Sequence, residues 1–216
     1  MKKLFVGFIL ICLYSCRDVQ AEGGSVFYFD NPQPVNDSEL SELPSGFRGT
    51  YNAGDRQRLV ISDKIIYNET DFSETMLKSE LDSVGGIYKN GKFMLDGQMY
   101  SAVEQKDSLL LTGVLKDTIF MLSLTQKAKR INGQLVLSTK DSVFWKVNIV
   151  SLQKDSLKIR HLSTPDDYIA IKSLVKNLKS TADTSVVNIN PTRAEFRKIL
   201  KIKKLGWEKG YKKIRS

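Results

Sequence analysis

Few residues in this sequence have the types and spacing that catalysis requires. The two cysteines, Cys12 and Cys16, both fall within the first 16 residues, and His161 is the only histidine. A domain without cysteine has no thiol nucleophile and no cysteine-bound zinc. A single histidine beside leucine and isoleucine is more often a core or rim residue than a base or a ligand. The sequence therefore predicts no catalytic residue of these types, no metal site and no cofactor.

Carboxylates are the remaining candidates for catalysis, because a pair of them can hydrolyse a glycan. The candidates are Glu104, Asp166 and Asp167, which fall at predicted turns or helix starts, where solvation or capping explains them. The sequence also lacks a glycine-rich phosphate loop, a Gly-x-Ser-x-Gly elbow and a calcium loop. Enzymatic activity is left open, and a protein without enzymatic activity is favoured over a hydrolase that uses paired carboxylates.

Basic residues gather at the C-terminal end. The net charge is +9, and residues 170–216 carry 13 Lys and Arg against 3 Asp and Glu. This excess predicts contact with an anionic lipid or glycan, and a solvated face that aids solubility is the alternative. No nucleic-acid-binding module accompanies the charge, so nucleic acid is not an expected partner. The residues predicted to make the contact are Arg197, Lys198, Lys201 and Lys204.

The fold must position these candidate residues, and the clearest evidence for the fold in the sequence is a repeated turn motif. The phrase Lys-Asp-Ser/Thr followed by an apolar residue begins at Lys106, Lys116, Lys140 and Lys154. Asp and Ser favour turns because they hydrogen-bond their own backbone, and a strand-forming run follows each phrase. Asn132-Gly133 adds the dipeptide best suited to a two-residue hairpin. Residues 106–161 therefore read as an antiparallel meander.

Further turns at Asn90-Gly91 and Asp96-Gly97 extend this pattern toward the N-terminus. Regular turns between short strands are typical of a sandwich or barrel. The predicted fold is mainly β: an antiparallel meander that forms a barrel or sandwich of about ten strands over residues 46–164. Residues 73–84 lack the alternation of apolar and polar residues that is typical of a strand, which predicts a short helix or an irregular connection.

The β domain is flanked by segments of different character. Residues 17–45 predict a tether, although residues 26–29 are aromatic enough to pack on the domain or to pair as an edge strand. Residues 165–216 predict a basic helical segment packed on the β domain. One helix is expected from residue 165 to about 178, and a capping box at Thr192 and Glu195 predicts another over residues 192–204. The chain after that helix is expected to be a tail or a last strand.

Residues 1–16 have the order of a signal peptide, with two lysines, an apolar run at residues 4–13, and Leu-Tyr-Ser-Cys at residues 13–16. This motif resembles the lipobox of bacterial lipoproteins. The resemblance implies that Cys16 carries acyl chains such as palmitate and anchors the protein to a membrane. Arg17, not aspartate, follows the cysteine, which favours an outer-membrane lipoprotein of the cell envelope, periplasmic or surface-facing. A cleaved secretory peptide and an uncleaved anchor are the alternatives.

Asp followed by Ser or Thr and an aliphatic residue resembles the O-glycosylation motif of Bacteroidetes-type bacteria. Turn chemistry alone would also produce this phrase. The hydroxyl residues that match are Ser83, Ser108, Thr118, Ser142 and Ser156.

The Phe-x-Gly-x-Tyr strand at residues 47–51, followed by hairpins and a late helix, is similar in pattern to lipocalin-type barrels, although their Gly-x-Trp signature is absent. We therefore expect a membrane-anchored envelope lipoprotein whose β domain binds a small apolar ligand or an envelope protein. A glycan-acting hydrolase of the envelope and a purely structural scaffold are the alternatives.

Overall fold

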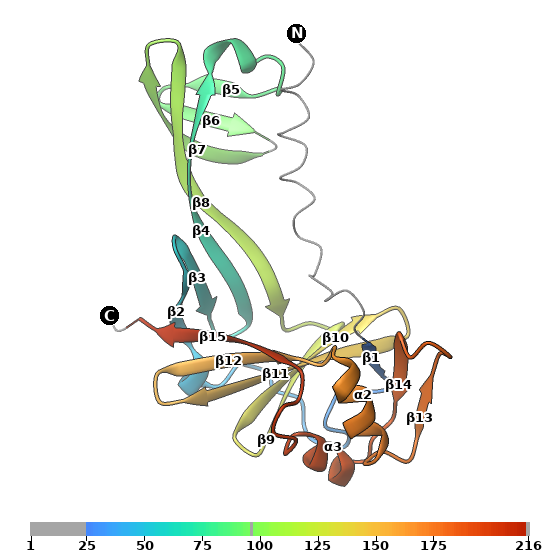
Figure 1. Ribbon diagram of the computed structural model, residues 1–216. Coiled ribbons are helices and arrows are strands. Elements are labelled where there is room, and N and C mark those ends of the chain that lie inside the picture. The colour runs from blue at the N-terminus through green and yellow to red at the C-terminus, as the bar shows by residue number, and fades with distance from the viewer. Residues whose placement is uncertain (1–24, 96, 215–216) are drawn as a thin grey trace.

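Tight turns fold most of the chain into an antiparallel meander. The computed structural model describes residues 25–95 and 97–214 (Figure 1), and fifteen strands among them share one sheet. Two α-helices accompany the sheet. The predicted class, a mainly β barrel or sandwich with one or two C-terminal helices, is confirmed, with fifteen strands in place of about ten and a sheet that does not close.

Most of the predicted hairpin turns form. Asn90-Gly91 has φ values of 52° and 70°, and Asn132-Gly133 has 51° and 78°. Positive φ at both residues is what a type I′ hairpin requires. Three of the four repeated phrases also turn the chain, with one loop residue each at positive φ: Lys106, Ser142 and Lys154.

The phrase that begins at Lys116 is not a turn, contrary to the prediction. It lies inside β8 (Ser108–Met121), which pairs with the full length of β4 (Ile65–Leu77). The register of the β4–β8 pair shifts between Ile66 and Tyr67, opposite the end of this phrase, which marks a β-bulge. Pairing between distant strands therefore overrides the local preference for a turn.

The same pairing corrects the expectation for residues 73–84. Strand β4 continues to Leu77, and only η2 (Lys78–Glu80), a single 3-10 turn, is helical in this stretch. The strand is 13 residues long and β8 is 14. Together they form a long ribbon that rises from the rest of the molecule (Figure 1).

The base, which comprises residues 25–71 and 114–214, holds a sheet curled around one hydrophobic core. Fully buried members of this core include Tyr51, Leu59, Leu135 and Leu157. The hydrogen-bonded order is β9-β10-β11-β12-β15-β2-β3-β4-β8. The remaining bounds are β2 (Gly49–Gly54), β3 (Gln57–Ile61), β9 (Gln126–Ile131), β10 (Gln134–Asp141), β11 (Phe144–Gln153), β12 (Ser156–His161) and β15 (Trp207–Lys213).

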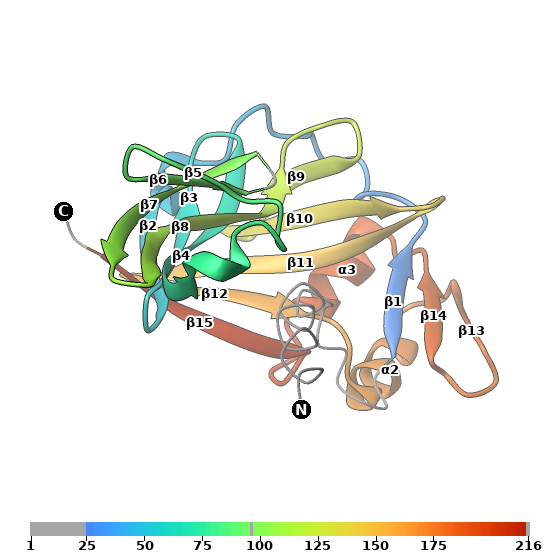
Figure 2. The same ribbon diagram turned by 90° about the horizontal axis from the view of Figure 1, so that it is seen from above.

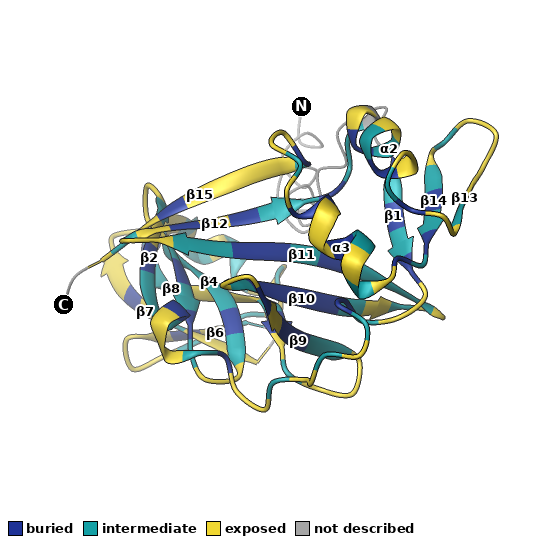
Figure 3. Cartoon of the chain, turned by 90° about the horizontal axis from the view of Figure 1, so that it is seen from below, coloured by how far each residue is buried: buried dark blue, intermediate teal, exposed yellow. Residues whose placement is uncertain are grey.

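A second core lies on the opposite face of β10 and β11. Val147 and Ile149 share one face of β11 and pack in this second core, while Val150 packs in the first. The two strands are therefore covered on both faces, and Figure 3 shows them among the most buried, in contrast to the largely exposed β15. The second core is covered by β1 (Val26–Phe29), β14 (Val186–Ile189), α2 (Pro165–Lys172) and α3 (Arg193–Ile199).

The described part of the predicted tether, residues 25–45, is folded onto the base. Strand β1 pairs in parallel with β14 and also pairs with β11, so it is not an edge strand. Phe29 and Leu43 are fully buried. The aromatic residues of β1 and the long-range pairing explain why this segment is ordered. Residues 1–24, which include the lipobox-like motif and Arg17, lie outside the described residues.

The C-terminal segment contains strands as well as helices. The last strand, β15, is one of the two alternatives expected after the second helix, whereas two strands between the helices were not expected. Helix α2 ends at Lys172, and the N–H groups of Leu174 and Val175 both donate to the Ile171 carbonyl of its last turn. Helix α3 ends at Ile199, since the chain then turns into β15, which lies inside the sheet between β12 and β2. A hairpin of β13 (Leu178–Ser180) and β14 separates the helices, and Figure 2 shows these elements gathered at one side of the base.

The tip comprises residues 72–95 and 97–113, at the far end of the ribbon. Strands β5 (Ile87–Lys89), β6 (Lys92–Leu95) and β7 (Gln98–Gln105) extend the sheet in the order β4-β8-β7-β6-β5. One face of this small sheet has its own core, with Phe93, Ala102, Leu109 and Leu111 buried. The tip therefore packs independently of the two cores in the base.

Candidate functional site

The structure places one of the three candidate catalytic carboxylates far from the other two in the fold. Glu104 lies on β7 in the tip, where it pairs with Lys78 at 2.8 Å. Asp166 and Asp167 lie in the first turn of α2, in the base. No group of three or more His, Cys, Asp and Glu side chains is placed to hold a metal ion within residues 25–95 and 97–214.

Asp167 has a structural role that its sequence position only partly indicates. The side chain is 1% exposed and accepts hydrogen bonds from the N–H groups of Thr164 at 2.9 Å and Ser163 at 3.1 Å. It also accepts one from Gly206 at 2.6 Å. This carboxylate therefore caps α2 and ties it to the turn before β15.

His161 is part of an aromatic pair. Its ring stacks on Trp207 with centroids 4.3 Å apart, because the two residues are directly opposite in the β12–β15 pair. Beside them, Glu208 binds Arg160 and Lys158. Hydrogen bonds from these two cations lower the pKa of the Glu208 carboxyl.

The interior of the curled sheet is filled by side chains of the first core, including Phe120 at 1% exposed. Two shallow depressions lie instead on the outside of the base. One, of about 540 Å³, lies between the β11–β12 turn and β15. The other, of about 300 Å³, lies between the segment of residues 31–39 and Lys129.

Lys129 is a buried cation with its own partners. Its Nζ donates to the carbonyls of Pro32 at 3.2 Å and Pro34 at 3.0 Å, and burial lowers the pKa of its ammonium group. The two carbonyls explain its burial, since a buried charge requires hydrogen bonds. Lys129 therefore holds the N-terminal segment against β9.

Helix α3 packs on the base as the sequence predicts. Phe196 and Ile199 are fully buried, and Leu200 is 8% exposed. Arg197 and Lys198 lie on the exposed side of the helix, while Lys201 and Lys204 lie exposed in the turns that follow it. The structure adds other exposed cations at this end of the base that the prediction missed: Lys172, Lys176 and Lys203.

The predicted glycosylation residues differ in accessibility. Ser83, Thr118, Ser142 and Ser156 are exposed, and Ser108 is half-buried, with its hydroxyl donating to the Gln105 carbonyl. Ser83 and Ser142 lie in turns, and Ser108 and Ser156 are the first residues of their strands. Thr118 lies inside β8.

The feature that the sequence analysis missed is an apolar surface on the tip. Ile87, Met94 and Met99 are directly opposite one another on β5, β6 and β7, so their side chains share one face of the sheet. Val103 lies on the same face of β7 and opposite Leu110 of β8. These five residues define the outer face of the tip. Ile87, Met94, Met99 and Val103 are 58%, 42%, 68% and 57% exposed.

The signal for this surface is present in the sequence but ambiguous. Strand β7 carries apolar residues on both faces: Met99 and Val103 on one, Tyr100 and Ala102 on the other. Such a strand usually lies between two packed layers. Only the structure shows that no second layer from residues 25–95 and 97–214 covers the face of Met99 and Val103.

No known family model matches the chain, and neither a curated protein nor a solved structure matches it significantly. Among the described residues, no helix combines the length and apolar character needed to cross a bilayer.

Proposed function

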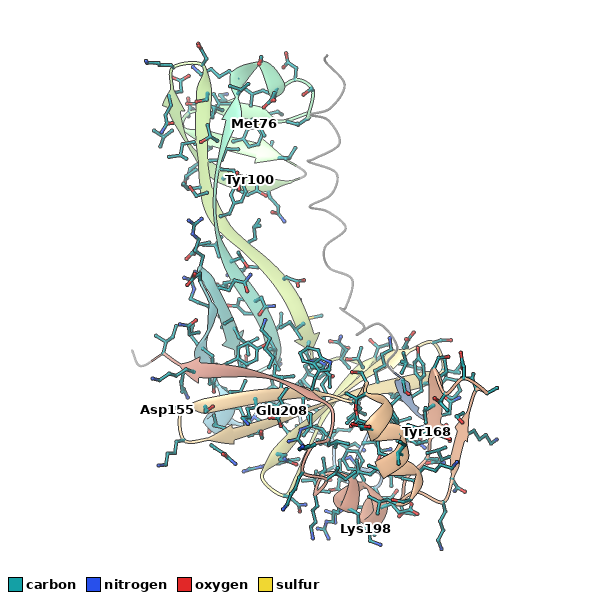
Figure 4. The ribbon with its side chains drawn as sticks, viewed as in Figure 1. Met76, Tyr100, Asp155, Tyr168, Lys198 and Glu208 are labelled. Carbon is teal, nitrogen blue, oxygen red and sulfur yellow. The ribbon has the colours of Figure 1, made fainter. Side chains whose placement is uncertain are left out.

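We propose that the protein is a lipoprotein of the outer membrane that holds a partner-binding tip away from the membrane to which it is anchored. The anchor is the acylated Cys16 of the lipobox-like motif. The observation that carries this function is that the basic end and the apolar tip lie at opposite ends of the molecule. Figure 4 labels Lys198 at one extreme of the base, and Met76 and Tyr100 in the tip at the other.

The length of chain between the lipid and the fold supports this orientation. Eight residues, 17–24, separate Cys16 from Ser25, and fully extended they span at most about 29 Å. Ser25 precedes β1, which belongs to the base. The tip is carried on β4, whose 13 residues correspond to about 43 Å. An anchor at Cys16 therefore holds the base close to the membrane, and the length of the ribbon allows the tip to lie farther away.

The charge distribution favours the same orientation. The cations around α3 face solvent while the apolar side of the helix is occupied by the second core. Each such charge near an anionic surface contributes about 1 kcal/mol at most, within a Debye length of about 8 Å at physiological salt. This surface therefore orients a protein that its lipid already anchors.

The anchor is tested by replacing Cys16 with serine in the full-length precursor. We expect the variant to keep its unprocessed mass and to leave the outer-membrane fraction, because it has no thiol to acylate. Metabolic labelling with an alkynyl fatty acid should mark the parent chain alone. Normal processing and outer-membrane recovery of Cys16→Ser would overturn the proposed anchor.

The basic surface is tested without the lipid, on a chain that begins at Arg17. Arg197, Lys198, Lys201 and Lys204 are replaced together by glutamine, and binding to anionic vesicles is measured at low and physiological salt. We expect the parent to bind several-fold better than the variant at low salt, and this difference to shrink as salt rises. A matched control replaces Lys89 and Lys92, in the tip, by glutamine. Equal binding by all three proteins would mean that the charge around α3 only aids solubility.

A further inference from the structure

The outer face of the tip is an exposed surface of a sheet whose opposite face packs on its own core. On the opposite side of the same sheet, Phe93 is fully buried, and Tyr100 packs against Phe72 with ring centroids 5.4 Å apart. Gly86 lies so close to Phe93 that an added Cβ would stand 2.3 Å from its ring. The tip thus has a satisfied core of its own, and the outer residues are not needed to fill it. Exposed contiguous apolar patches of this kind mark interaction sites.

The charges on this face all have one sign. Lys89 and Lys92 are directly opposite each other on β5 and β6, next to Ile87 and Met94, and Lys92 is opposite Ser101. Like charges in directly opposite positions destabilise a strand pair. Within residues 25–95 and 97–214, no acidic residue shares the outer face of β5, β6 and β7, and neither lysine forms a salt bridge. The Lys92 ammonium group donates a hydrogen bond to the Ser101 hydroxyl at 3.2 Å.

The acidic residues of the tip lie elsewhere. Glu104 is opposite Leu109, a member of the tip core, so it points to the other face, where it pairs with Lys78. Glu74 is opposite Leu111 and shares that face. The two lysines of β5 and β6 therefore lie beside the apolar surface, whereas Glu74 and Glu104 lie on the opposite face.

This arrangement of charges favours one kind of binding partner for the apolar face over the others. A symmetric pair of tips would bring the lysines of both copies together, which is unfavourable for an isologous contact. A lipid surface lies at the other end of the molecule if the proposed function holds, on which the present inference rests. An apolar protein surface bordered by carboxylates matches both the methionines and the lysines.

We propose that the outer face of the tip docks on a second, different protein, through an apolar surface of that protein bordered by Asp or Glu side chains. Met94 and Met99 supply adaptable apolar contact at the centre. Lys89 and Lys92 pair with the carboxylates at the border. Their contribution is specificity and rate of association more than affinity, since rim charges act mainly on encounter.

The test places a photo-crosslinking amino acid at Met99 in the full-length, acylated protein, in cells that produce it. The control places the same residue at Gln98, which is also exposed but points to the opposite face, where its side chain binds the Tyr100 hydroxyl at 2.8 Å. We expect one discrete protein adduct from position 99 and at least fivefold less from position 98. Mass spectrometry should place the captured peptide in another protein, at a surface with apolar and acidic residues.

Charge reversal then separates specific docking from incidental capture. Lys89→Glu with Lys92→Glu should reduce the adduct at least fivefold, whereas Lys89→Arg with Lys92→Arg should preserve it. Circular dichroism and melting temperature should be the same for both pairs, because the two side chains lie on the surface.

Four results would overturn the inference: an adduct of twice the chain mass, adducts with lipid alone, equal capture from positions 98 and 99, or an adduct that charge reversal leaves unchanged. Lipid adducts from the tip would also contradict the proposed orientation. The other three would leave the membrane anchor and the orientation intact, so the two proposals fail separately.

Discussion

At the scale of single residues, the buried charged groups of the base stabilise the fold. Asp167 receives three backbone N–H groups, and Lys129 donates to two carbonyls. Arg193, the first residue of α3, binds Asp37 through both Nε and Nη2. These contacts join segments far apart in the sequence, which is why their roles could not be inferred from spacing alone.

Replacing Asp167 with alanine should destabilise the base strongly. Three N–H groups would lose their acceptor, and leaving buried donors unsatisfied costs about 1 to 3 kcal/mol each. We expect the free energy of unfolding to fall by about 3 kcal/mol or more in urea titrations. The matched control is Asp166→Ala, at the exposed neighbour, which should cost no more than about 1 kcal/mol through the helix dipole. Similar losses in both variants would contradict the capping role.

The Asp37–Arg193 pair should make stability depend on acid pH. The hydrogen bond from Arg193 lowers the pKa of the Asp37 carboxyl, and attraction to the same guanidinium adds to this. A carboxyl with a depressed folded-state pKa stabilises the fold fully above its unfolded pKa of about 3.9, and this contribution is lost as pH falls through the folded-state pKa.

We therefore expect Asp37→Asn to be less stable than the parent at pH 7, and the difference between the two proteins to shrink as pH falls below about 4. Urea unfolding of both proteins between pH 7 and pH 3 measures this. A constant difference over that range would show that ionisation of Asp37 does not contribute. Glu42→Gln is a suitable control, since the Glu42–Arg48 pair is more exposed.

At the scale of elements, the two-residue turns were the part of the fold most accessible to sequence analysis. Asn90-Gly91 and Asn132-Gly133 form as predicted because their local chemistry and their long-range pairing agree. The phrase at Lys116 and the described part of the tether were misjudged because pairing with β4, β11 and β14 decides their conformation. Local preference carries no information about such partners.

The tip should unfold separately when its own core is damaged. Gly86→Ala places a methyl group against the buried ring of Phe93, and overpacking of this kind costs about 1 to 3 kcal/mol. Hydrogen exchange should then show faster exchange of amides in β5, β6 and β7, with little change in β10 and β11. Gly46→Ala, where an added Cβ meets nothing within 4 Å, is the control. Uniform acceleration across both regions would mean that tip and base form one cooperative unit.

The apolar outer face of the tip marks the limit of sequence analysis for the candidate site. The alternation in β7 identifies which residues share a face, but not whether a second layer covers that face. The exposure of Met99 and Val103 depends on the absence of packing partners, which is a property of the assembled chain. The cations around α3 could be predicted in part from the sequence, because the capping box and the spacing of Phe196 and Ile199 located the helix.

At the scale of the whole molecule, the central claim is an orientation: base beside the membrane, tip away from it. Figures 1 and 4 show the ribbon of β4 and β8 separating these two ends. Because the chain after Cys16 has no cysteine, a single introduced thiol can report on one end at a time. Ala194, exposed on α3, and Gln105, exposed beside the β7–β8 turn, suit this purpose without removing a charge.

The most direct test attaches one fluorophore to Ala194→Cys or to Gln105→Cys in the acylated protein, reconstituted in anionic vesicles that contain a lipid with a quenching head group. The account predicts quenching at position 194 several-fold stronger than at position 105. Quenching at position 105 equal to or stronger than at position 194 would contradict the orientation and, with it, the proposed role of the tip.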